Sequence, residues 1–134
     1  MNKRRIARNF LIADRVINII GLVVLIIAPI VLLVVGIVFM VKGDFNGNKD
    51  EVAVAVSGLS IVISSAVTFF VGVPLAIVAL VFNGVASRGL GRAQNRQQGH
   101  RPGVLAIVSG ALLGTFGIPA GIIMLVMNDN DYQR

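Results

Sequence analysis

Three long stretches of this sequence contain no Asp, Glu, Lys, Arg or His. They are Val16–Val41, Val52–Phe82 and Gly103–Met127, which hold 26, 31 and 25 residues. A helix needs about 20 apolar residues to cross the roughly 30 Å hydrocarbon core of a bilayer, so each stretch is long enough. A water-soluble fold is not expected, because little amphipathic sequence remains to surround three such segments.

The composition agrees with a membrane protein. Of the 134 residues, 56% are hydrophobic and 13% are charged, whereas about 25% of residues in an average soluble domain are charged. Because lipid offers the backbone no hydrogen-bond partner, membrane-spanning segments are helices or closed β-barrels. The three stretches are longer than barrel strands and lack their polar alternation. The sequence therefore predicts an all-α integral membrane protein with three transmembrane helices in a small bundle.

The segment before the first apolar stretch is short, basic and amphipathic. Residues 1–15 are expected to form a cytoplasmic or interfacial helical lead-in, with Ile6 and Phe10 opposite Arg4 and Arg8. The apolar stretch behind it is too long for a signal-peptide core and has no A-x-A-like cleavage site, so a retained anchor is expected. The predicted order is transmembrane helices at 16–41, 52–82 and 103–127, an outer loop at 42–51, a basic cytoplasmic loop at 83–102 and an outer tail at 128–134.

Basic residues gather on one side of the predicted bundle. Nine of them precede the first helix or separate the second from the third, against three in the other two regions. The positive-inside rule then places the N-terminus in the cytoplasm and the C-terminus outside, in a cell membrane that we expect to be a bacterial inner membrane. Anionic lipid headgroups are the expected partners of the nine. The nine residues are Lys3, Arg4, Arg5, Arg8, Arg15, Arg88, Arg92, Arg96 and Arg101.

Small residues recur at a strict four-residue spacing in the second predicted helix and every three or four positions in the third. Helices in a bilayer associate through close van der Waals contact, which small side chains permit. The two patterns therefore predict that these helices pack tightly, within the chain or between copies in a homo-oligomer. The predicted packing residues are Ala106, Gly110, Gly114, Gly117 and Gly121 in the third helix and Ser60, Ser64, Thr68, Gly72 and Ala76 in the second.

A proline lies inside each predicted transmembrane helix. Pro29, Pro74 and Pro119 lack the N–H that a helix interior needs, which favours a kink at each position. Bending at Pro74, together with tilt, would help the 31-residue stretch fit the bilayer.

No catalytic, cofactor or metal site is expected. The three stretches contain no ionisable residue, so acid–base pairs and proton relays lack candidates at membrane depth. Cysteine is absent, and His100 has no carboxylate nearby to complete a zinc site. Asp44 and Asp50 alternate with asparagines as in half of a calcium loop, but Lys49 stands where that loop needs glycine, so a hydrated turn is expected. Nucleic-acid binding is not expected, because the basic residues are split between two juxtamembrane segments.

Two functions are consistent with the sequence. The first is a non-catalytic scaffold or accessory subunit that packs through its small-residue faces against itself or a larger membrane protein. The alternative is a holin-like or channel-like pore, assembled through the stripe from Gly110 to Gly121 with the hydroxyl groups between Ser60 and Thr68 toward water. The favoured interpretation of those hydroxyl groups is that they bond to carbonyl groups of their own or a neighbouring helix.

Overall fold

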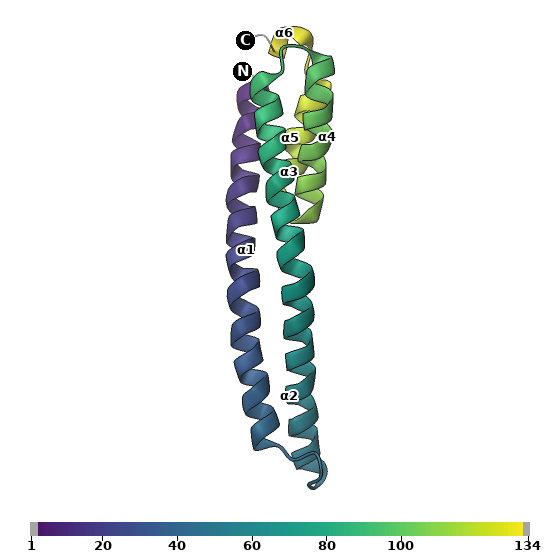
Figure 1. The fold of residues 1–134 in the computed structure, drawn as a ribbon. Coiled ribbons are helices and arrows are strands. Elements are labelled where there is room, and N and C mark those ends of the chain that lie inside the picture. Colours follow the sequence, from purple (N-terminus) through teal and green to yellow (C-terminus); the bar gives the residue numbers. More distant parts are fainter. Residues whose placement is uncertain (1–2, 133–134) are drawn as a thin grey trace. The chain divides into compact units, whose positions relative to one another are not determined.

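The computed structural model describes residues 3–132, and most of them are helical (Figure 1). No strand occurs in that range, which confirms the predicted all-α class. The elements are α1 (Lys3–Lys42), α2 (Lys49–Val67), the π-helix η1 (Thr68–Gly72), α3 (Val73–Arg92), α4 (Arg96–Leu112), α5 (Gly117–Val126) and α6 (Asp129–Tyr132).

Two helical runs are long and apolar enough to cross a membrane. They are α1 and the run Lys49–Arg92, in which α2, η1 and α3 follow one another without interruption. The runs hold 40 and 44 residues, or roughly 60 and 66 Å at about 1.5 Å per residue. Both exceed the roughly 30 Å hydrocarbon core. The basic lead-in is not a separate element, because α1 begins at Lys3.

The third uncharged stretch forms two helices, so the expectation of one helix at 103–127 is wrong and the three-span bundle is not confirmed. The chain turns at residues 113–116, and α5 runs back beside α4 (Figure 1). Leu113 has φ −147° and ψ −45°, outside the helical region. Gly114 and Gly117 disfavour a continuous helix, and Pro119 falls in the first turn of α5, where a missing N–H is tolerated. The glycines and the proline that disfavour a continuous helix thus lie where the chain reverses its direction.

The other two prolines leave their helices continuous. Pro29 lies inside α1. Pro74 is the second residue of α3, just after η1, where the helix widens to the π form. Because Pro74 cannot donate an N–H to the carbonyl four residues earlier, a local π segment relieves the mismatch.

The chain divides into two compact units, and the first contains residues up to Gly21 together with those from Leu75 onward. The first part of α1 packs here with α3, α4, α5 and α6. Its buried apolar core combines alanines, which let the helix backbones approach closely, with larger leucine, methionine and tyrosine side chains. They include Ala7, Leu11, Ala86, Leu90, Ala106, Ala120, Met124, Met127 and Tyr132.

The second unit, Leu22–Pro74, pairs the later part of α1 with α2 and η1. The two helices touch through backbone at Gly36 and Gly58. A Cβ built on Gly36 would lie 2.8 Å from the Gly58 carbonyl oxygen, and one on Gly58 would lie 2.6 Å from the Gly36 carbonyl oxygen. Ser65 is buried in the same seam, where its Oγ donates a 2.6 Å hydrogen bond to the Pro29 carbonyl.

The two ends of the described chain meet in the first unit (Figure 1). The Arg4 guanidinium donates to the Tyr132 carbonyl at 2.6 Å, and Lys3 Nζ lies 3.9 Å from Asp131 Oδ2. The structure therefore does not confirm the expected arrangement of an inner N-terminus with an outer C-terminus. The reversal at residues 113–116 returns α5 and α6 toward the start of α1, which brings these groups together.

Tyr132 anchors α6 and is expected to titrate above ordinary tyrosines. Its hydroxyl donates to the Met124 carbonyl, and burial is the main cause that raises the pKa of Tyr132 above 10.0. Arg4 and Arg96 oppose that rise, while Asp131 adds to it. The folded state therefore retains the phenolic proton longer, and its stability should fall as the pH rises through and above about 10. The sequence has one Tyr and no Trp, so ultraviolet absorbance of the phenolate measures this directly; a midpoint at or below that of free tyrosine contradicts it.

Candidate functional site

The strongest polar constellation in the described chain surrounds Asp14 of α1, which is fully buried. Its Oδ2 accepts hydrogen bonds from Asn83 Nδ2 at 2.7 Å and from Ser109 Oγ at 2.8 Å, and a longer one from Asn18 Nδ2 at 3.3 Å. Its Oδ1 accepts the backbone N–H of Gly117 at 3.1 Å. All four donors complement a carboxylate, and they come from α1, α3, α4 and α5. We call these residues the Asp14 cluster.

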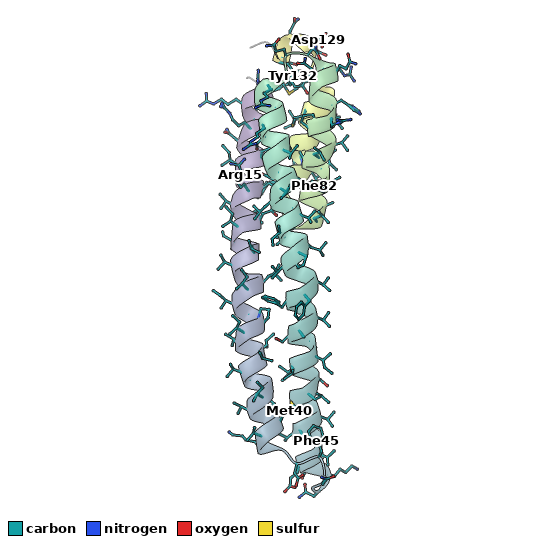
Figure 2. All side chains as sticks on the ribbon, in the orientation of Figure 1. Arg15, Met40, Phe45, Phe82, Asp129 and Tyr132 are labelled. Atoms are coloured by element: carbon teal, nitrogen blue, oxygen red, sulfur yellow. The ribbon has the colours of Figure 1, made fainter. Side chains whose placement is uncertain are left out.

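Arg15 fixes the orientation of Asn83 within the Asp14 cluster. Arg15 Nε donates to Asn83 Oδ1 at 3.0 Å, and Arg15 Nη2 donates to Ser87 Oγ at 2.9 Å. Figure 2 shows Arg15 on α1 at the height of Phe82, the residue before Asn83. With its oxygen committed, the Asn83 amide turns its NH₂ group toward Asp14 and toward the Leu11 carbonyl, 3.0 Å away. The arginine thus supports the carboxylate through a neutral amide.

Ser109 and Asn18 complete the Asp14 cluster, and they differ in how fully their polar atoms are hydrogen-bonded. The Ser109 hydroxyl lies 2.8 Å from Asp14 Oδ2 and 3.0 Å from the Ala79 carbonyl, and its single proton serves one of these acceptors at a time. Asn18 directs its NH₂ group toward Asp14 and Ser109. Its Oδ1 has no hydrogen-bond partner among the described residues, although Asn18 is fully buried.

The carboxylate of Asp14 also serves the reversal between α4 and α5. Phe116, the N-cap residue of α5, makes no side-chain cap hydrogen bond. Asp14 supplies an oxygen from α1 instead, at the helix end whose dipole favours negative charge. A Cβ built on Gly114 would lie 2.0 Å from Asp14 Oδ1, so only glycine lets the carboxylate reach this position. Gly114 therefore makes room for Asp14, a role different from the predicted helix packing.

The other small residues predicted in the third helix meet one another across the α4–α5 hairpin. A Cβ on Gly117 would lie 2.5 Å from the Ala106 carbonyl oxygen and 2.7 Å from the Gly110 nitrogen. One on Gly121 would lie 2.4 Å from the Gly103 carbonyl oxygen. These small residues thus pack against one another within the chain, because the segment that carries them folds back on itself.

The small residues predicted in the second helix share no single face. Ser60 and Ser64 are exposed, whereas Ala76 is buried; Thr68 and Gly72 are partly buried. From Ala76 to Leu90 the buried positions follow alternating steps of three and four residues, the spacing of two helices that pack side by side. That spacing is visible in the sequence, and the strict four-residue rule missed it. The buried residues are Ala55, Gly58, Ser65, Ala76, Ala79, Asn83, Ala86 and Leu90.

The Asp14 cluster was missed because Asp14 was assigned to the lead-in outside the apolar stretches. A signal was present, since Asp14 and Asn18 continue the spacing of the buried Ala7 and Leu11 on one face of α1. Polar residues that continue an apolar stripe are candidates for a buried network.

The loop between α1 and α2, where a hydrated turn is expected, forms a turn and a helix cap. Asp44 Oδ1 accepts the Asn46 N–H at 2.9 Å, and Asn48 Oδ1 accepts the Glu51 N–H at 2.9 Å, which caps α2. Within residues 3–132 no group of three or more His, Cys, Asp or Glu is placed to hold a metal ion.

Two of the nine basic residues, Lys3 and Arg4, lie beside Asp131 and Tyr132 in the first unit. Arg4 is committed to carbonyl oxygens of α3, at Leu90 and Gly91, each 2.8 Å away, as well as to Tyr132. The side chains of Arg5, Arg8, Arg88, Arg92, Arg96 and Arg101 are exposed. Comparison with protein families, with curated proteins and with solved structures gave no match, so the geometry alone guides any functional assignment.

Proposed function

We propose that this chain is a non-catalytic scaffold or accessory subunit of a cell membrane, in a bacterial inner membrane. It would cross the bilayer twice, through α1 and through the run Lys49–Arg92, and its α4–α5 hairpin would enter from the basic, cytoplasmic side without crossing. The observation that supports the proposal is the contrast between the surfaces that join the helices and those that face outward. Polar groups and glycines hold the chain's own helices together, while long apolar side chains face outward.

The outward face of α1 supports an apolar environment. Ile20, Ile27 and Val34 each expose more than half of their surface, at 57%, 55% and 57%. Such residues fit acyl chains and the apolar flanks of partner helices, which are equally hydrophobic. An assembly through this face would depend on van der Waals contact between complementary apolar surfaces and would require no catalytic group.

The depth of the hairpin supports entry without crossing. A Cβ on Gly21 would lie 2.9 Å from Leu113 Cδ2, so the α4–α5 turn lies level with Gly21 of α1. Gly21 is five residues beyond Val16, where the first uncharged stretch begins, or roughly 8 Å along the helix. That depth is a small part of the roughly 30 Å core.

Cysteine accessibility tests this arrangement, and the natural absence of cysteine simplifies it. Single substitutions Arg5→Cys, Asn46→Cys and Asn130→Cys place thiols at exposed positions near each end and in the loop before α2. In spheroplasts, a membrane-impermeant maleimide is expected to label only Asn46→Cys, and permeabilised membranes should expose the other two. Labelling of Asn130→Cys in sealed spheroplasts would refute the two-crossing arrangement.

The scaffold role is tested by capturing neighbours. A photo-crosslinking residue at Ile20, Ile27 or Val34 is expected to give discrete protein adducts in cells, whereas crosslinks to lipid alone contradict the role. A matched probe at the buried Met124 should give none.

The pore remains a second candidate because Ser60 and Ser64 are exposed on α2. Because the glycines of α4 and α5 already pack against each other inside the hairpin, a pore would have to assemble through these hydroxyl groups. Inducing expression while following the membrane potential separates the two roles. Prompt depolarisation that Ser60→Val with Ser64→Val abolishes favours the pore, and unchanged potential with continued growth favours the scaffold.

A further inference from the structure

An open groove of about 410 Å³ runs between α3 and α4 in the first unit. Three arginines line it, Arg88 and Arg92 from α3 and Arg101 from α4. Val85, Leu105 and Pro102 supply apolar wall. The groove therefore combines cationic and hydrophobic surface in one place.

The two kinds of surface are ordered along the groove. A Cβ on Gly89 would lie 2.2 Å from Pro102 Cγ, which places these two residues at the same level of the antiparallel pair. Val85 and Leu105 then lie on the side toward the hairpin turn, and Arg92 lies on the side of the chain ends. The helical distance from Val85 to Arg92 is roughly 10 Å at about 1.5 Å per residue. This length is comparable to the headgroup region, which adds about 5–8 Å to each face of the hydrocarbon core.

The arginines of this groove are available to a ligand. None of the three forms a hydrogen bond or ion pair with another residue between 3 and 132, and no carboxylate lines the groove. In the neighbouring groove between α1 and α3, Arg4 is committed to backbone carbonyls, and Arg5 and Arg8 also line that groove. Gln98 adds an amide at the outer rim of the α3–α4 groove.

We propose that the α3–α4 groove binds one anionic phospholipid. Arg88, Arg92 and Arg101 would hold the headgroup phosphate, and Val85 with Leu105 would contact the start of an acyl chain. Charge complementarity selects an anion, and the apolar inner end selects a lipid over free phosphate. The site is compatible with either role considered above, so its test is independent of them.

The experiment uses the full chain in neutral detergent and counts bound lipid by native mass spectrometry. Phosphatidylglycerol is expected to bind at one preferred site, more tightly than phosphatidylcholine, and inorganic phosphate should not displace it. Each arginine contributes about fivefold to affinity. Arg88→Gln, Arg92→Gln and Arg101→Gln together should weaken binding on the order of 100-fold. Val85→Trp, which narrows the apolar end at an exposed position, should also weaken phosphatidylglycerol binding.

The matched control removes three other exposed arginines, Arg5, Arg8 and Arg96, and so changes the net charge equally. It should retain most of the affinity. Equal weakening by both triple variants would show a diffuse charge effect and overturn the proposal, as would displacement of the lipid by inorganic phosphate. Thermal unfolding of each variant checks folding, and the single Arg92→Gln variant, with its smaller expected loss, serves if the triple variant unfolds.

Discussion

Replacing Asp14 with alanine is expected to lower the free energy of unfolding by about 3 kcal/mol. The substitution leaves the donors of Asn83, Ser109 and Gly117 without the carboxylate that they share in a fully buried site. Asn83 and Ser109 retain the carbonyl groups of Leu11 and Ala79, so the loss is smaller than three full desolvation penalties. Denaturant or thermal unfolding of the detergent-solubilised chain, followed by circular dichroism, measures the change.

Two further variants separate charge from volume at this position. Asp14→Asn keeps the shape but turns an NH₂ group toward a set of donors, so most of the loss should remain. Asp50→Ala removes an exposed carboxylate outside the Asp14 cluster and should change stability by less than about 0.5 kcal/mol. If Asp14→Ala unfolds within that margin of the parent, the Asp14 cluster does not hold the first unit together.

The helical class and the two long apolar helices could be predicted because they follow from local properties. Length, the absence of charge and the need for satisfied backbone hydrogen bonds act on each segment separately. The same rules cannot predict whether an apolar segment continues as one helix or reverses its direction. A 25-residue apolar stretch passes the length test whether it continues straight or reverses halfway, as it does between Leu112 and Gly117.

The candidate site was harder to predict because it depends on which segments meet. Asp14 is separated by 69 residues from Asn83 and by 103 from Gly117, and no local pattern links them. The charge-based division of the chain placed Asp14 at a water-facing end, where a carboxylate needs no partner. Only the folded-back hairpin brings the N–H of Gly117 and the space above Gly114 to its side chain.

The second large effect is expected from two glycines of the α4–α5 hairpin. Gly110→Ala with Gly117→Ala should destabilise the protein by about 3 kcal/mol, at the upper end of the range for overpacked sites. The added Cβ atoms would lie 2.5 Å from the Ile118 nitrogen and 2.5 Å from the Ala106 carbonyl oxygen. Both are backbone atoms, so no side-chain rotation relieves the contact. The two helices must separate, which also draws Gly117 away from Asp14.

Gly84→Ala is the matched control, because a Cβ there meets nothing within 4 Å. It replaces a helical glycine with the best helix former and should leave stability unchanged or raise it by up to about 1 kcal/mol. A cysteine at the buried Met124 reports opening of the hairpin through its maleimide reactivity. Reactivity should rise with the paired glycine substitutions and stay low with Gly84→Ala. If the paired variant and Gly84→Ala had the same stability and the same maleimide reactivity, the close approach of α4 and α5 at Gly110 and Gly117 would not contribute to the stability of the hairpin.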